Sequence, residues 1–106
     1  MNSCCGLTQK QIGSIINILK KHTDIQVCII FGSRAKGTQN KSSDIDMVLQ
    51  GTELTHRTIA SVHFKLNEET NLPYKFDVLN YHTITNNNLI DHINRVGVCI
   101  YKKEGS

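Results

Sequence analysis

Short apolar runs alternate with longer segments of helical period along most of the chain, and this alternation restricts the possible folds more than any other feature. Helices are predicted over residues 7–21, over residues 55–70, and from Thr83 or Thr85 to Gly97. Thr8 and Gln11 have the spacing of a capping box at the start of the first helix. Strands are predicted over residues 25–31, 44–50, 74–81 and 98–101. This order of elements predicts an α/β fold in which helices pack on a small mixed sheet.

The length of 106 residues allows one small domain, so we expect a single domain over residues 1–106. The longest unbroken apolar run, Val27–Phe31, is far shorter than the roughly 20 residues of a membrane span. The N-terminal sequence MNSCCGLTQKQ lacks the basic and apolar regions of a secretory signal. We therefore expect a cytoplasmic protein without a membrane partner.

The four cysteines form no C-x-x-C pair, which leaves zinc-ribbon and thioredoxin folds without support. Cys28 and Cys99 lie in apolar runs and are predicted to be small core residues. The histidines show no metal-ligand spacing, although His82 follows a predicted strand and could border a site there. A net charge of +3 is too small to indicate a nucleic-acid-binding protein.

Two acidic residues, Asp44 and Asp46, lie two apart on the second predicted strand. Residues two apart in a strand face the same way, roughly 6–7 Å from each other. Their carboxylates can converge on one point, which is unfavourable for like charges unless a cation joins them. Two magnesium ions are a common way to meet such carboxylates, because Mg²⁺ favours oxygen ligands and phosphates.

A Gly-Ser turn precedes this pair and supplies a complementary anion site. Gly32 allows the backbone to leave the first strand in a conformation that most residues avoid. Ser33 and the amides after it open a short helical turn over residues 33–37, and Arg34 adds a charged fork. A polar loop over residues 38–43 follows. Phosphates held at this turn, bridged by metal to the two aspartates, would belong to a nucleoside triphosphate.

Each of these features has a commoner explanation when it stands alone. A Gly-Ser pair after a strand is usually only a turn, and a D-x-D on a strand is often a solvated face. Short basic clusters are also common on protein surfaces. The combined pattern G-S-x10-D-x-D, with each half next to a predicted strand, is far more specific.

The segments GSRAKG at residues 32–37 and SDIDMV at residues 43–48 carry a family resemblance. They resemble the signature of the minimal nucleotidyltransferases of the DNA polymerase beta superfamily, and the element order and length fit over nearly the whole chain. The resemblance implies a polymerase-beta-like fold and transfer of a nucleoside monophosphate, AMP from ATP, to an acceptor hydroxyl with release of pyrophosphate. It implies that Gly32, Ser33, Arg34 and Ser43 bind the nucleotide.

The resemblance also implies a third carboxylate on a later strand, which would act as a metal ligand or as the base for the acceptor. Asp77 in YKFDVLNY is the candidate, with Phe76 and Val78 facing the other side of the strand. Glu68 and Glu69 compete for this role, but they lie in a helical pattern that favours solvent. Asp44, Asp46 and Asp77 would then hold two Mg²⁺ ions.

The predicted elements use the whole chain and leave no residues for an acceptor pocket. The resemblance implies a helical-bundle partner encoded nearby, either of a substrate-binding type or a HEPN-type toxin that the chain neutralises as antitoxin. We expect an oligomer, with the contact on apolar residues of the last helix, and no direct nucleic-acid partner. The alternative is a catalytically weak module that neutralises its partner by contact alone.

Overall fold

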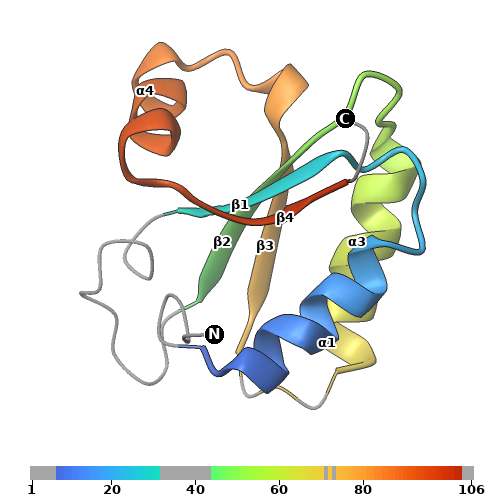
Figure 1. Ribbon diagram of the computed structural model, residues 1–106. Coiled ribbons are helices and arrows are strands. Elements are labelled where there is room, and N and C mark those ends of the chain that lie inside the picture. The colour runs from blue at the N-terminus through green and yellow to red at the C-terminus, as the bar shows by residue number, and fades with distance from the viewer. Residues whose placement is uncertain (1–6, 32–43, 71, 73, 104–106) are drawn as a thin grey trace.

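The computed structural model describes residues 7–31, 44–70, 72 and 74–103, and forms an α/β fold around one sheet (Figure 1). The described helices are α1 (Gln9–Leu19), α3 (His56–Glu68), the short 3-10 helix η1 (Tyr81–Thr83) and α4 (Asn87–Val96). The strands are β1 (Val27–Phe31), β2 (Ile45–Gln50), β3 (Phe76–Asn80) and β4 (Val98–Lys102). Each predicted helix and strand in this part of the chain is present, with ends that differ by a few residues. The predicted turn at 33–37 and loop at 38–43 lie outside the described residues.

The sheet has the strand order β3-β2-β1-β4. β1 is antiparallel to both β2 and β4, whereas β2 and β3 run parallel. A parallel pair needs a crossover connection, and α3 supplies it between β2 and β3. The predicted mixed sheet is therefore confirmed.

Two apolar clusters lie on opposite faces of this sheet. The larger one joins α1 and α3 to the inward side chains of the strands, among them Ile15, Leu66 and Phe76, all fully buried. The smaller one centres on Phe31, Val48 and Ile93 and joins α4 to the other face. Figure 1 shows α1 and α3 side by side and α4 on the opposite side of the sheet.

The helix starts show which local signals the sequence carried. Thr8 caps α1 in the predicted capping box, since its side chain accepts from the Gln11 N–H and the Gln11 side chain accepts from the Thr8 N–H. The prediction that Thr83 or Thr85 opens the last helix is wrong. Asn86 caps α4 through Oδ1, because η1 takes up the residues after β3 before the chain turns into the helix.

The predicted burial of Cys99 is wrong, and Gly97 ends the last helix for a different physical reason than a left-handed conformation. Cys28 is buried as predicted, but Cys99 is exposed, because it lies on β4, an edge strand with β1 as its single strand neighbour. Gly97 ends α4 as predicted, but with φ −66° it has no left-handed conformation. A Cβ there would lie 2.4 Å from the Ile93 carbonyl oxygen and 2.5 Å from the Ile29 side chain, so close approach requires the glycine.

Among the described residues, no helix combines the length and apolar character needed to cross a membrane.

Replacing Gly97 and Gly13 with alanine should change the free energy of unfolding in opposite directions. Gly97→Ala forces the α4–β4 connection apart and should lower the free energy of unfolding by about 1–3 kcal/mol. Gly13→Ala, inside α1 with nothing within 4 Å of the added Cβ, should raise it by about 0.5–1 kcal/mol. Urea denaturation of both variants measures this, and a Gly97→Ala protein as stable as wild type would contradict the close approach.

Candidate active site

A row of side chains crosses three strands on the face that α4 partly covers. Phe31 of β1 is the register partner of Asp46 of β2, and Asp46 is the register partner of Asp77 of β3. Partners in adjacent strands point to the same face, so these three side chains lie next to one another. Asp44, two residues before Asp46, is exposed and continues this side of the strand. The structure therefore brings together all three aspartates that the sequence singled out.

The alternation of β2 and β3 fixes which way these carboxylates point. In β2, Ile45, Met47 and Leu49 are fully buried against α1 and α3, which turns Asp46 to the other face. In β3, buried Phe76 does the same for Asp77, which is exposed. The hydrophobic core on one side of the sheet thus sets the position of the acidic side chains on the other.

The next row along the same face is apolar. Ile29, Val48 and Leu79 are register partners across β1, β2 and β3, and Ile93 of α4 packs in their cluster. This row lies two residues, or roughly 6–7 Å, from the carboxylate row. α4 packs on this face over the apolar row, and Tyr81 of η1 packs in the same cluster. The carboxylates therefore lie between the apolar row that α4 covers and the end of the sheet where β1 stops and β2 begins.

The electrostatics of the row are those of like charges held close together. Asp46 is half-buried, and this burial raises its pKa above the ordinary range for an aspartate. The negative charges of Asp77 and Asp44 raise the pKa of Asp46 further. A group that is disfavoured in its charged form, beside two other carboxylates, is the arrangement that a bound cation relieves.

The donor set fits a hard divalent cation in its chemistry. Asp44, Asp46 and Asp77 supply only carboxylate oxygens, which Mg²⁺ prefers over nitrogen and sulfur. Within the described ranges, no group of three or more His, Cys, Asp or Glu side chains is arranged so that it could hold a metal ion. The three aspartates lie within reach of one another's charge but do not form a complete metal site.

The remaining predicted residues are divided between two situations. Gly32, Ser33, Arg34 and Ser43 lie outside the described residues. Glu68 and Glu69, the competitors of Asp77, are exposed at the end of α3, on the opposite side of the sheet from the carboxylate row.

His82 does not border the carboxylates. Its Nε2 accepts a hydrogen bond from the Gly51 N–H at 3.2 Å, just beyond the other end of β2. The prediction that it could edge the site is wrong, because β3 carries the chain away from Asp77 before His82 is reached.

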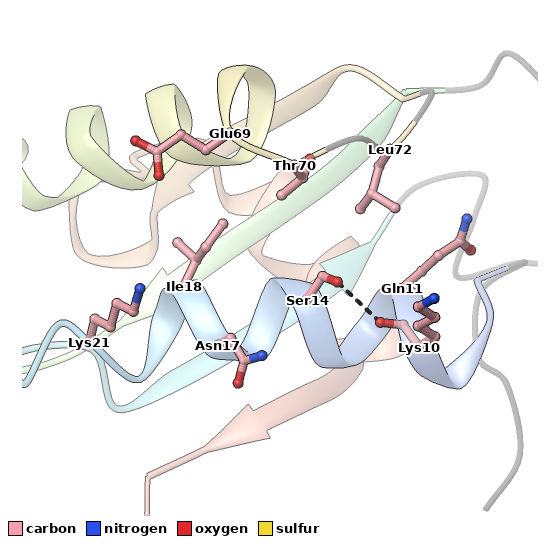
Figure 2. A pocket seen from close by; sticks show the side chains of 9 residues that line it. All are labelled: Lys10, Gln11, Ser14, Asn17, Ile18, Lys21, Glu69, Thr70 and Leu72. Carbon is pink, nitrogen blue, oxygen red and sulfur yellow. Dashed lines mark hydrogen bonds between the residues drawn. The ribbon is translucent and has the colours of Figure 1, made fainter.

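A hollow of about 540 Å³ lies away from the carboxylates, on the side of the sheet that α1 and α3 cover. Figure 2 shows it between α1 and the end of α3, with Lys10 and Lys21 near its two ends and Glu69 across from them. Ile18 and Leu72 supply its apolar lining. The hollow shares no residue with the aspartate row, so it is a separate surface feature.

One contact next to the row has no counterpart in the sequence interpretation. The side-chain amide of Asn67, in α3, pairs with both backbone groups of Phe76, the residue before Asp77. An asparagine in a helix gives no sign of such a partner nine residues away, so only the three-dimensional structure identifies it.

Solved structures provide the comparison for the fold. A chain in the crystal structure of a toxin–antitoxin pair with AMP-PNP has a TM-score of 0.72 and 22% identity, over 88% of this chain and 74% of that one. A chain in the complex of the tri-AMPylated Shewanella oneidensis HEPN toxin with its MNT antitoxin has a TM-score of 0.68 and 18% identity, over 91% and 73%. A chain of the toxin–antitoxin complex MntA-HepT has a TM-score of 0.68 and 18% identity, over 92% and 74%.

No curated protein matches the sequence. The profile of the family described as Polymerase beta, Nucleotidyltransferase matches residues 13–106, a range that contains the carboxylate row and every described strand. The chain therefore belongs to the polymerase beta nucleotidyltransferase family.

Proposed function

We propose that the chain transfers AMP from ATP to a hydroxyl group of a partner protein and releases pyrophosphate. The observation that carries this proposal is the register of β2 with β3, which sets Asp46 beside Asp77 with Asp44 two residues away. Family membership supports nucleotidyl transfer as the class of reaction. Similar folds occur in toxin–antitoxin complexes, one of which contains an AMPylated toxin, and this supports a protein acceptor.

Each aspartate has a role that follows from its place in the row. Asp44 and Asp46 hold Mg²⁺ together with the triphosphate, and half-buried Asp46 gains most from the cation because its own charge is the least solvated. Asp77, exposed at the outer side of the row, completes the metal site and accepts the proton of the attacking hydroxyl. When bound, Mg²⁺ supplies charge neutralisation at the α-phosphate and the departing pyrophosphate.

The phosphate contacts in this proposal rest on the sequence. Gly32, Ser33, Arg34 and Ser43 flank the row in the chain, because Phe31 ends β1 and Asp44 precedes β2. We assign the β- and γ-phosphates to the first three, through backbone N–H groups and the guanidinium. Positioning and charge neutralisation then account for most of the rate.

The partner is proposed to be a helical protein encoded by the adjacent gene, of the HEPN or the substrate-binding type. The predicted contact on the last helix has limited apolar surface, since Leu89 and Ile93 of α4 pack in the cluster on the sheet. The exposed large apolar side chain of the described residues is Phe64 of α3, at 58% exposure.

The direct test combines the chain with the product of the adjacent gene, Mg²⁺ and labelled ATP. Size-exclusion chromatography should show a complex, and mass spectrometry should show added AMP on the partner and none on the chain. A complex without AMP transfer would support the alternative, a module that acts by contact. A monomer that ignores this neighbour and adenylylates a small molecule would overturn the two-protein proposal.

Asp44→Asn and Asp46→Asn should each reduce transfer on the order of 100-fold or more while the fold is retained, because each removes charge that holds the metal. Initial rates at saturating Mg²⁺ measure this. Asp91→Asn is the matched control, since Asp91 lies in an exposed ion pair with Arg95 on α4 and should leave the rate unchanged. Near wild-type transfer by Asp44→Asn would remove it from the site.

Asp46→Asn should also stabilise the metal-free protein at neutral pH. A raised pKa means that the folded state holds the Asp46 proton more tightly than the unfolded state does. The contribution of Asp46 to wild-type stability is therefore complete below its unfolded pKa and is lost as pH rises through its folded pKa. A neutral asparagine at this position does not lose charge-free burial as pH rises. The variant's Tm should therefore exceed that of wild type by about 1–3 °C at pH 7, a small gain because Asp46 is partly solvated.

Thermal melts with EDTA, at pH 7 and near pH 3, check this stability difference. The difference should vanish near pH 3, where Asp46 of the wild type is protonated and is as neutral as the asparagine of the variant. Asp91→Asn should show no gain in Tm at either pH. A variant less stable than wild type at pH 7 would mean that Asp46 is not under repulsion.

Asp77→Asn separates chemistry from binding. The loss of the proton acceptor should lower kcat on the order of 100-fold, while the Kd for ATP changes by less than about 3-fold when Mg²⁺ is saturating and compensates for a weaker metal site. Calorimetric titration and steady-state kinetics measure the two quantities. Normal transfer by this variant would return Glu68 and Glu69 to consideration.

A further inference from the structure

β3 is an edge strand, and it carries one carboxylate of the row. The order β3-β2-β1-β4 leaves β3 with a single strand neighbour, so alternate backbone groups of β3 point away from the sheet. On the inner side, the Ile45 N–H donates to the Lys75 carbonyl at 2.9 Å. The backbone groups of the next residue, Phe76, therefore lie on the outer edge.

The side chain of Asn67 occupies this edge at Phe76. Its Oδ1 accepts from the Phe76 N–H at 2.8 Å, and its Nδ2 donates to the Phe76 carbonyl at 3.1 Å. The same Nδ2 donates to the His63 carbonyl at 2.9 Å, which fixes the amide to α3. One side chain thus pairs with Phe76 as a residue of a further strand would, and ties it to the helix.

This two-point contact fixes the backbone of β3 at Phe76 in the observed register. In this register the N–H and C=O of Lys75 and of Asp77 face β2, so of these three residues only Phe76 offers both groups to the amide of Asn67. A slip of β3 by one residue would turn Asp77 to the face of α1 and α3. A slip by two would move Asp77 roughly 6–7 Å along the sheet and away from Asp46.

We propose that Asn67 is a positioning residue of the active site, which holds Asp77 opposite Asp46 by fixing the backbone of Phe76. This inference rests on the proposed function, because it assigns Asn67 to the carboxylates that bind metal and nucleotide. Asn67 acts through Phe76 and contacts none of the reacting atoms. Fixing the residue before Asp77 leaves the carboxylate only its own side-chain torsions, and reduces the reorganisation needed when a cation binds.

A purely structural role would show itself differently. If Asn67 only protects the edge and stabilises the domain, its replacement should lower the Tm and leave metal affinity and kcat unchanged. Loss of a side-chain-to-backbone hydrogen bond elsewhere in the domain should have the same effect. Asn86 is the matched case, because its Oδ1 accepts from the Asn88 and Leu89 N–H groups at the start of α4, away from the aspartate row. Both residues use a side-chain amide to satisfy backbone groups.

The test compares Asn67→Ala with Asn86→Ala in the full chain. Both should lower the Tm of the metal-free protein. Asn67→Ala alone should weaken Mn²⁺ binding in the presence of AMP-PNP by about 10–100-fold, as supporting partners of metal ligands do. It should also lower kcat for AMP transfer to the product of the adjacent gene on the order of 100-fold, with little change in KM for ATP. Asn86→Ala should leave both quantities unchanged once measured below its Tm.

Each outcome separates the two ideas. Equal Mn²⁺ affinity and kcat in the two variants would overturn the role of Asn67 and leave the proposed function standing. A wild-type chain that binds Mn²⁺ with AMP-PNP but transfers nothing would overturn the proposed function, and Mn²⁺ affinity would still decide on Asn67. A wild-type chain without Mn²⁺ affinity overturns both. Should Asn67→Ala fail to fold, Asn67→Gln, which keeps the amide on a longer stem, is compared by the same criteria.

Discussion

The parallel pairing of β2 with β3 is the constraint on which the rest of the structure depends, because it places like charges side by side. Asp46 and Asp77 are register partners, and Asp44 adds a third charge at the start of β2. This repulsion is offset on the other face of the same strands. There Ile45 and Phe76, themselves register partners, are fully buried under α1 and α3. The apolar half of each strand holds the acidic half in position.

This arrangement explains why the site borders the apolar cluster under α4. A carboxylate row in the middle of a covered sheet would be desolvated, and its members would take up protons. A row in full solvent would feel little of its neighbours' charge. Asp46 lies between these limits, one row from the cluster around Val48 and next to exposed Asp77. In the proposed function, this border position would keep the charges strong enough to attract a cation and accessible enough to receive one.

Local signals in the sequence predicted most of this fold. The period of α1, the capping box at Thr8 and the alternation of β3 are read from neighbouring residues, and each was confirmed in type. Because residues two apart share a face of a strand, the closeness of Asp44 to Asp46 also followed from spacing alone. The place of Asp77 required knowledge of the family, since spacing within one strand says nothing about which strand lies beside it.

The features that the sequence did not predict depend on distant partners. Cys99 has an apolar neighbourhood in the chain but lies on an edge strand in space. Asn67 pairs with a residue nine positions away, and Gly97 is required by the approach of Ile29 from β1. None of these contacts produces a repeating pattern in the sequence, because each joins one residue to a single site on another helix or strand.

The central position of β1 has a consequence for how the chain folds. β1 pairs with β4, and the Lys103 N–H donates to the Gln26 carbonyl at 2.7 Å, so partners at opposite ends of the described chain must meet. Contacts of such large sequence separation form slowly, because loop closure comes before the gain from pairing. Until β4 pairs, β1 presents an open edge, which makes this strand the point where the folding chain is most exposed to pairing with another.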